Sequence, residues 1–136
     1  MRSNDHLPAE WRPVGDMLSL IGDKWTVMVI GDLGNGKRRF SELKRDIEGI
    51  SQKMLANTLK ALEREGFVLR TFYPVILPRV EYELTALGRQ LLRPLEGLAE
   101  FALMHQSQVE LARRRFDAEL GGPGRGSPHA DRSGLD

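Results

Sequence analysis

Apolar residues recur at helical spacing near the start of the chain. Intervals of three, one and three residues place four apolar side chains on one face of a helix over residues 14–21: Val14, Met17, Leu18 and Ile21. Gly22 interrupts this pattern, and Asp23 then offers an N-cap for a second helix over residues 24–33, which Gly34 ends. This part of the chain therefore predicts two helices.

The next stretch predicts two helices separated by a tight turn. Ser41 is the expected N-cap of a short amphipathic helix that ends at Ile47. Gly49 then supplies the turn, and Ser51 can cap a longer helix over residues 52–65. A helix, a short turn containing glycine and a second helix form the helix-turn-helix signature.

The 52–65 helix has two chemically different faces. At about 100° per residue, one face gathers the apolar positions: Leu55, Thr58, Leu59 and Leu62. The opposite face carries Lys53, Asn57, Lys60 and Arg64. We expect the first face to be buried and the second to be cationic and exposed. With Phe40, Leu43 and Ile47 from the preceding segment, the leucines are the predicted core.

A β-hairpin follows this helix. Residues 67–73 (FVLRTFY) and 79–84 (RVEYEL) are rich in aromatic and β-branched residues, and the stretch between them (PVILP) is a proline-bounded loop. Such a hairpin beside a helix-turn-helix makes a winged helix. Arg79 could reach a DNA backbone or minor groove, or it could pair with Glu81 or Glu83, and the sequence leaves both open.

The rest of the chain predicts long helices. Thr85 caps a helix that we expect Pro94 to interrupt, and from Leu95 a final helix of about 25 residues would extend about 37 Å. Its apolar positions alternate at three and four residues: Leu95, Leu98, Ala102, His105, Val109, Ala112 and Phe116. A helix this long on so small a domain has too little of its own chain to pack against, so the stripe predicts a second subunit.

The predicted fold class is therefore mostly α with a small β-hairpin (α+β): a winged helix-turn-helix with a long terminal dimerisation helix. We expect residues 1–13 to be an N-terminal arm, residues 14–120 to form the single domain, and residues 121–136, rich in glycine and proline, to be a disordered tail.

Charge changes this picture more than composition does. The net charge of the 136 residues is only +1, which by itself favours no acidic partner. Residues 37–79, however, hold 10 basic and 5 acidic side chains. Because the positive excess coincides with the helix-turn-helix and the hairpin, double-stranded DNA is the expected partner.

Candidate contacts follow from side-chain chemistry. Base edges are the expected targets of Lys53, Asn57 and Lys60, because Lys pairs with guanine and Asn with adenine. Phosphates are the expected targets of side chains at the start of the 52–65 helix and just before it: Ser51, Gln52, Arg38, Arg39 and Lys44.

Other functions fit parts of the sequence less well. Exposed charges on a helix can simply be solvated, and a winged helix can bind protein instead of DNA. Residues 31–37 match the glycine and lysine spacing of a phosphate-binding loop, but Arg38 stands where Ser or Thr should hold magnesium. We therefore expect no enzyme.

Metal, thiol and membrane functions are also disfavoured. The three histidines are far apart, so we expect no metal and no cofactor. The chain has no cysteine, which excludes disulfides and thiol chemistry of its own. No apolar run approaches the roughly 20 residues of a membrane helix, so the expected location is the cytoplasm, without a membrane partner.

The sequence as a whole resembles the HxlR-type winged-helix transcription regulators, which are MarR-like. The resemblance spans about residues 13–101 and rests on residues 22–26 (GDKWT), 38–43 (RRFSEL), 49–51 (GIS), 73–74 (YP), 78–82 (PRVEY) and 84–88 (LTALG).

The resemblance implies a DNA-binding homodimer with residues 51–65 as recognition helix and residues 67–84 as wing. It also implies that the outer helices form the dimer interface, so that Val14, Met17 and Leu18 join the terminal stripe. A repressor on an inverted repeat, with recognition helices about 34 Å apart, is the expected form.

Regulation is expected to differ from that of several family members. Those members carry a cysteine just before a proline at the start of the domain and sense electrophiles or oxidants through it. In this chain Arg12 precedes Pro13. The signal is therefore expected not to be thiol-based, which leaves a noncovalent small-molecule effector, a partner, or no signal.

Overall fold

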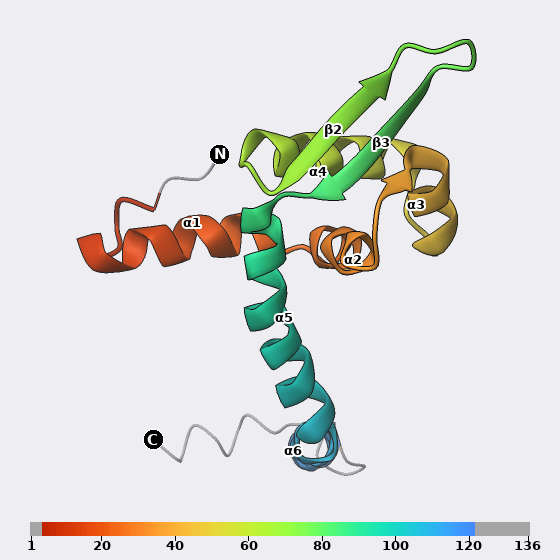
Figure 1. Cartoon of the computed structure of the whole chain (residues 1–136). Coiled ribbons are helices and arrows are strands. Elements are labelled where there is room, and N and C mark those ends of the chain that lie inside the picture. The colour runs from red at the N-terminus through yellow and green to blue at the C-terminus, as the bar shows by residue number, and fades with distance from the viewer. Residues whose placement is uncertain (1–3, 122–136) are drawn as a thin grey trace. The chain divides into compact units, whose positions relative to one another are not determined.

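The computed structural model describes residues 4–121 (Figure 1). Its elements are a 3-10 turn η1 (Ala9–Trp11), α1 (Arg12–Ile21), α2 (Lys24–Leu33), β1 (Arg38–Arg39), α3 (Phe40–Asp46), α4 (Gln52–Arg64), β2 (Val68–Tyr73), β3 (Arg79–Leu84), α5 (Ala86–Met104) and α6 (Gln106–Gly121). The chain divides into a first unit that ends at Leu95 and a second that begins at Glu96. This is the predicted winged helix-turn-helix.

Helix α1 begins earlier than its apolar pattern indicates. It starts at Arg12 instead of Val14, with Pro13 in its first turn, where a missing N–H costs nothing. The turn η1 precedes it, and the Asn4 side-chain amide donates a hydrogen bond to Asp16 at 2.7 Å. Local structure therefore extends into the segment assigned to an arm, whereas residues 122–136 lie outside the described part.

The sheet contains one strand that the sequence did not predict. Strand β1 pairs antiparallel with β3, placing Arg38 opposite Tyr82 and Arg39 opposite Glu81. The strand order is β1-β3-β2, and β2 and β3 form the expected hairpin, which extends beyond the helices of the first unit (Figure 1). Two residues are too few to show the alternation of polar and apolar side chains that marks a strand. Strand β1 is recognised only by its pairing with β3.

Strand β1 also changes the start of α3. The expected cap, Ser41, lies inside the helix, whose N-cap is Arg39. The Arg39 backbone N–H donates a hydrogen bond to the Glu42 carboxylate at 2.7 Å. The Glu42 carboxylate in the first turn thus accepts the hydrogen bond of a backbone N–H at the start of α3. The Ser41 hydroxyl is therefore not needed as the cap.

One apolar core holds the helix-turn-helix against the base of the hairpin. Its buried members are Val29, Ile30, Leu33, Leu43, Ile47, Ile50, Leu55, Leu59, Leu62, Phe67, Val68 and Leu84, with Phe40 packed against them. Two turns at its edge need a left-handed backbone: Gly49 between α3 and α4, with φ of 90°, and Gly66 after α4, with φ of 87°. The core therefore fixes the angle at which α4 is presented.

The terminal helices break at a different residue from the one predicted. Helix α5 continues through Pro94 to Met104, and the break lies at His105. Pro94 lies on an exposed stretch, so water can satisfy the carbonyl that loses its partner. At the break, the carbonyl of Phe101 lies 3.0 Å from both the backbone nitrogen and Nδ1 of His105. The expected single helix of 25 residues is therefore wrong, and its apolar stripe is divided between α5 and α6.

Candidate nucleic-acid interface

Helix α4 presents the two faces that its sequence predicts. Ser51 caps it by accepting a hydrogen bond from the Met54 backbone N–H at 3.0 Å. The inner face is buried: Leu55, Thr58, Leu59 and Leu62. The outer face carries Lys53, Asn57 and Lys60, all exposed. The cations and the amide are therefore available to a partner along the whole helix.

The start of α4 adds positive potential to this face. Ser51 and Gln52 are both exposed there. The Ser51 hydroxyl accepts a hydrogen bond in the cap and keeps its own O–H to donate, so a phosphate at this end would meet that hydroxyl, the first-turn backbone N–H groups and the Gln52 amide.

The cations before α4 fall into two groups. Arg39 and Lys44 are exposed, as a phosphate contact requires, and so is Lys37, which side-chain chemistry alone did not single out. Arg45 is also exposed, but its Nε lies 3.7 Å from Asp46. Arg38 differs, because its Nε lies 3.4 Å from Asp46 and 3.8 Å from Asp32. Two carboxylates thus neutralise the Arg38 charge, which weakens the prediction that it binds phosphate.

Arg79 takes the pairing role that the sequence left open. Its Nε donates a hydrogen bond to Glu81 at 3.0 Å, and its guanidinium lies 4.2 Å from the centre of the Tyr73 ring. The hydrogen bond from Arg79 holds the pKa of Glu81 below its usual value. Arg70, one strand away and exposed, is the hairpin cation that sequence reasoning missed, although it belongs to the counted charge excess.

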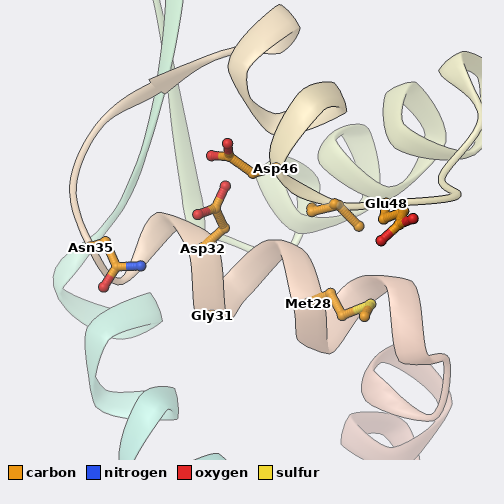
Figure 2. Close-up of a pocket in the computed structure, with 7 residues that line it drawn as sticks. Met28, Gly31, Asp32, Asn35, Asp46 and Glu48 are labelled. Carbon is orange, nitrogen blue, oxygen red and sulfur yellow. The ribbon is translucent and has the colours of Figure 1, made fainter.

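An acidic pocket of about 540 Å³ lies between α2 and the end of α3 (Figure 2). The Asp32 and Asp46 carboxylates point toward one another there, and one Asp32 oxygen is buried without a hydrogen-bond partner in the described residues. Burial, reinforced by the neighbouring Asp46, raises the pKa of Asp32 from 3.8 to about 6. The pocket repels anions, so it does not suit a nucleotide phosphate.

Residues 31–37, which match the glycine and lysine spacing of a phosphate-binding loop, do not adopt the structure of one. Gly31 lies inside α2, and residues 26–30, which would have to be a strand, are helical. A phosphate-binding loop needs a strand, a loop and then a helix. The nucleotide alternative therefore has no structural basis.

Comparisons with known proteins decide the family. Residues 20–110 match the sequence pattern of the HxlR-like helix-turn-helix family. The chain belongs to this family. It is 41% identical over 104 residues to the HTH-type transcriptional regulator YtfH of Escherichia coli (strain K12), an alignment that covers 76% of this chain and 82% of YtfH. It is thus a transcriptional regulator with a helix-turn-helix DNA-binding domain.

Solved HxlR-like structures agree with the fold. The transcriptional regulator ytfH from Salmonella typhimurium is 39% identical, with a TM-score of 0.67 over 84% of this chain and 99% of that one. The redox regulator HypR, in its reduced form, is 36% identical, with a TM-score of 0.67 over 72% of this chain and 97% of that one. The HxlR-like chain described here contains no cysteine.

The HxlR-like domain also contains a larger cavity, of about 950 Å³, between α1, the start of α2 and one flank of α4. The apolar side chains that line it include Met17, Leu20 and Phe67, and Asp16 is among its polar lining residues. Asn57 lines the cavity as well. A molecule bound there would therefore touch a residue that is also exposed on the outer face of α4.

The predicted dimer residues are partly exposed and apolar. Leu98 and Phe116 are both 61% exposed, and Val14, Leu18 and Val109 are exposed as well. Ala102 and Ala112 are also exposed, whereas Met17, Leu95 and His105 are half-buried. The His105 ring stacks on Phe101 with centroids 4.3 Å apart.

The described part of the HxlR-like chain offers neither a metal site nor a membrane span. Within residues 4–121, no cluster of three or more His, Asp or Glu side chains could hold a metal ion. Across the same residues, every helix is too short or too polar to cross a lipid bilayer.

Proposed function

We propose that the chain is a homodimeric repressor that binds an inverted-repeat operator through the outer face of α4. One observation carries this proposal: Lys53, Asn57 and Lys60 are exposed while the leucines of the same helix anchor it in the core. A rigid helix of this length fits the major groove, where a lysine can contact guanine and an asparagine adenine.

Phosphate contacts would position the helix. We assign them to the α4 N-terminus with Ser51 and Gln52, and to the exposed Arg39 and Lys44. Arg38 and Arg79 would contribute only after giving up their carboxylate partners, so we assign them secondary roles. About four contacts in each subunit give an expected slope of log affinity against log salt near −7.

The dimer is supported by the apolar surface of the outer helices. The interface would include Val14, Met17 and Leu18 of α1 and the stripe on α5 and α6: Leu95, Leu98, Ala102, His105, Val109, Ala112 and Phe116. Because a monomer rarely exposes so many large apolar groups on neighbouring turns, a second copy is the natural occupant.

Regulation would not pass through a cysteine thiol of this chain, since it has none. The cavity beside α4 suits a noncovalent effector with an apolar body. Because Asn57 lines that cavity, an occupant would compete directly with base contact. The proposed place of action is the cytoplasm, with the DNA it regulates.

The experiment is selection of bound duplexes from a random pool with the purified chain, followed by anisotropy titrations at several salt concentrations. We expect selected sites with two-fold symmetry, a salt slope near −7, and repression when the site overlaps a promoter in a reporter. A slope shallower than about −2 on a selected site contradicts the proposal. Failure to bind any duplex would also contradict the proposal and would favour a winged helix that binds protein.

A matched pair of variants removes equal charge in two places. Lys53→Ala with Lys60→Ala should abolish selection of a defined site, because it strips the outer face of α4. Arg113→Ala with Arg114→Ala removes two exposed cations from α6 and should leave the selected sequence unchanged. Equal effects of the two pairs would mean that only net charge matters.

A further inference from the structure

The loop between β2 and β3, residues 74–78, is the wing tip, and its side chains are all apolar. The proposed DNA-binding face of α4 does not explain why they are exposed. Ile76 is 95% exposed and Leu77 is 81% exposed, and Val75 beside them is also exposed. Exposed single aliphatic residues are common on protein surfaces, but three in succession at the end of a projecting hairpin are not.

The tip is stiff. Pro74 and Pro78 fix the backbone on both sides of it, and the Val75 backbone N–H donates a hydrogen bond to the Tyr73 carbonyl at 2.9 Å. Tyr73 and Arg79 form the last cross-strand pair, and the Arg79 guanidinium lies against the Tyr73 ring. These restraints at both ends of the tip reduce the conformational entropy that is lost when the tip is placed in a binding site.

The tip also lacks the chemistry for reading bases by hydrogen bonds. None of the five side chains from Pro74 to Pro78 has a donor or an acceptor, so the tip offers apolar volume alone. The apolar surface continues down the hairpin through the Phe72 and Val80 pair, where Phe72 is also exposed.

The neighbouring charges identify the occupant. Arg70 on β2 and Arg39 on β1 are exposed on opposite faces of the same small sheet, since Arg70 lies opposite Tyr82 and Arg39 opposite its neighbour Glu81. Exposed cations on the strands can bind the phosphates of a polyanion, and the apolar tip beyond them can contact stacked bases. Apolar wedges that enter a base step from the minor groove kink the duplex.

We propose that Ile76 and Leu77 insert into a base step from the minor groove and bend the operator. This inference rests on the proposed DNA-binding function and adds a deformation of the DNA to it. In a dimer, each wing would kink the duplex beyond its own recognition helix. Flexible pyrimidine–purine steps would be preferred at that position, although no side chain of the tip reads their edges.

The experiment compares the wild type with Ile76→Ser combined with Leu77→Ser on a selected site. Energy transfer between labels at the two duplex ends reports bending, and 2-aminopurine at the outer minor-groove steps reports unstacking. We expect the wild type to bend the duplex by at least about 20° at each wing and to raise the 2-aminopurine fluorescence. The double variant should still bind the site but lose both signals.

The control is Leu69→Ser, which makes the same chemical change at an exposed position near the base of the hairpin. It should bend and unstack the DNA like the wild type. Equal bending and unstacking by the wild type and the double variant would overturn the insertion while leaving the proposed function intact. If the double variant instead changes only the oligomeric state, the tip is a protein contact and the inference is wrong. Failure of the wild type to bind any duplex would refute the proposed function itself.

Discussion

Gly88 of α5 lies directly against the backbone carbonyl of Phe67, so that any side chain at position 88 would overlap that oxygen. Thr85 strengthens the same junction: its hydroxyl donates a hydrogen bond to the Gly66 carbonyl at 2.6 Å and accepts one from the Gly88 N–H at 3.0 Å. The start of α5 is thereby tied to the turn between α4 and β2. Helix α4 and the β2–β3 hairpin share this support.

Gly88→Ala should therefore destabilise the fold. The added methyl group would overlap the backbone carbonyl of Phe67, which can move only if the backbone shifts. We therefore expect a loss of about 2–3 kcal/mol in the free energy of unfolding, measured by urea denaturation. Gly31→Ala in α2 is the matched control, since a methyl group added there would meet no neighbouring atom within 4 Å outside its own helical turn. Gly31→Ala should raise the free energy of unfolding by about 0.5–1 kcal/mol, because alanine has the higher helix propensity. Similar effects at both glycines would show that the contact with Phe67 is unimportant.

The cap of α4 gives a second prediction. Ser51→Ala should cost about 1 kcal/mol of stability, because the Met54 N–H loses its acceptor. Ser41→Ala is the control: Ser41 was the expected cap of α3, yet it lies inside that helix, so its loss should change thermal stability very little. A larger loss for Ser41 than for Ser51 would contradict the observed helix boundaries.

The acidic pocket predicts a pH-dependent stability. The pKa of Asp32 is raised from 3.8 to about 6 in the folded chain, so between these values the folded state binds a proton that the unfolded chain does not. This carboxyl therefore opposes folding above pH 6, and that penalty disappears as the pH falls through 6 toward 3.8. Asp32→Asn should raise the melting temperature at pH 7.5, by an amount that shrinks steadily as the pH is lowered.

Glu48→Gln provides the comparison, because Glu48 lines the same pocket but is exposed. Melting curves from pH 7.5 to pH 4.5 should show the shrinking difference for Asp32→Asn alone. A difference that stays constant with pH would mean that Asp32 is not responsible.

The apolar faces of α5 and α6 predict the oligomeric state. We expect Leu98→Glu with Phe116→Glu to convert a dimer into monomers in sedimentation velocity runs, because two charges per subunit would be buried without partners. Ile76→Glu with Leu77→Glu introduces two charges per subunit at exposed apolar positions of the hairpin loop and should leave the dimer intact. A dimer that survives the double substitution would place the interface elsewhere.

Local patterns were enough for most of the fold, and tertiary pairing explains the errors. The two faces of α4 and the hairpin follow from spacing and side-chain type. Strand β1 depends on β3, which lies about forty residues further along the chain, so no local signal marks it. Pro94 was expected to end a helix, but exposure lets water replace the lost hydrogen bond, and the break falls at His105 instead.

The candidate site shows the same division. Lys53, Asn57 and Lys60 could be placed on the outer face from periodicity alone. The neutralisation of Arg38 could not, because Asp32 and Asp46 approach it from α2 and α3 only when the core forms. The cavity beside α4 likewise requires three separate helices to come together.

The most direct test of the account is the sequence preference of Asn57→Ala, determined by selection from a random duplex pool beside the wild type and Lys44→Ala. We predict that Asn57→Ala relaxes or changes the preference at one base pair in each half-site, at a cost of about 1–3 kcal/mol there. Lys44→Ala should weaken binding to all sequences alike and make the salt slope shallower by about 1 per subunit. An unchanged preference and affinity for both variants would contradict the claim that the outer face of α4 reads DNA.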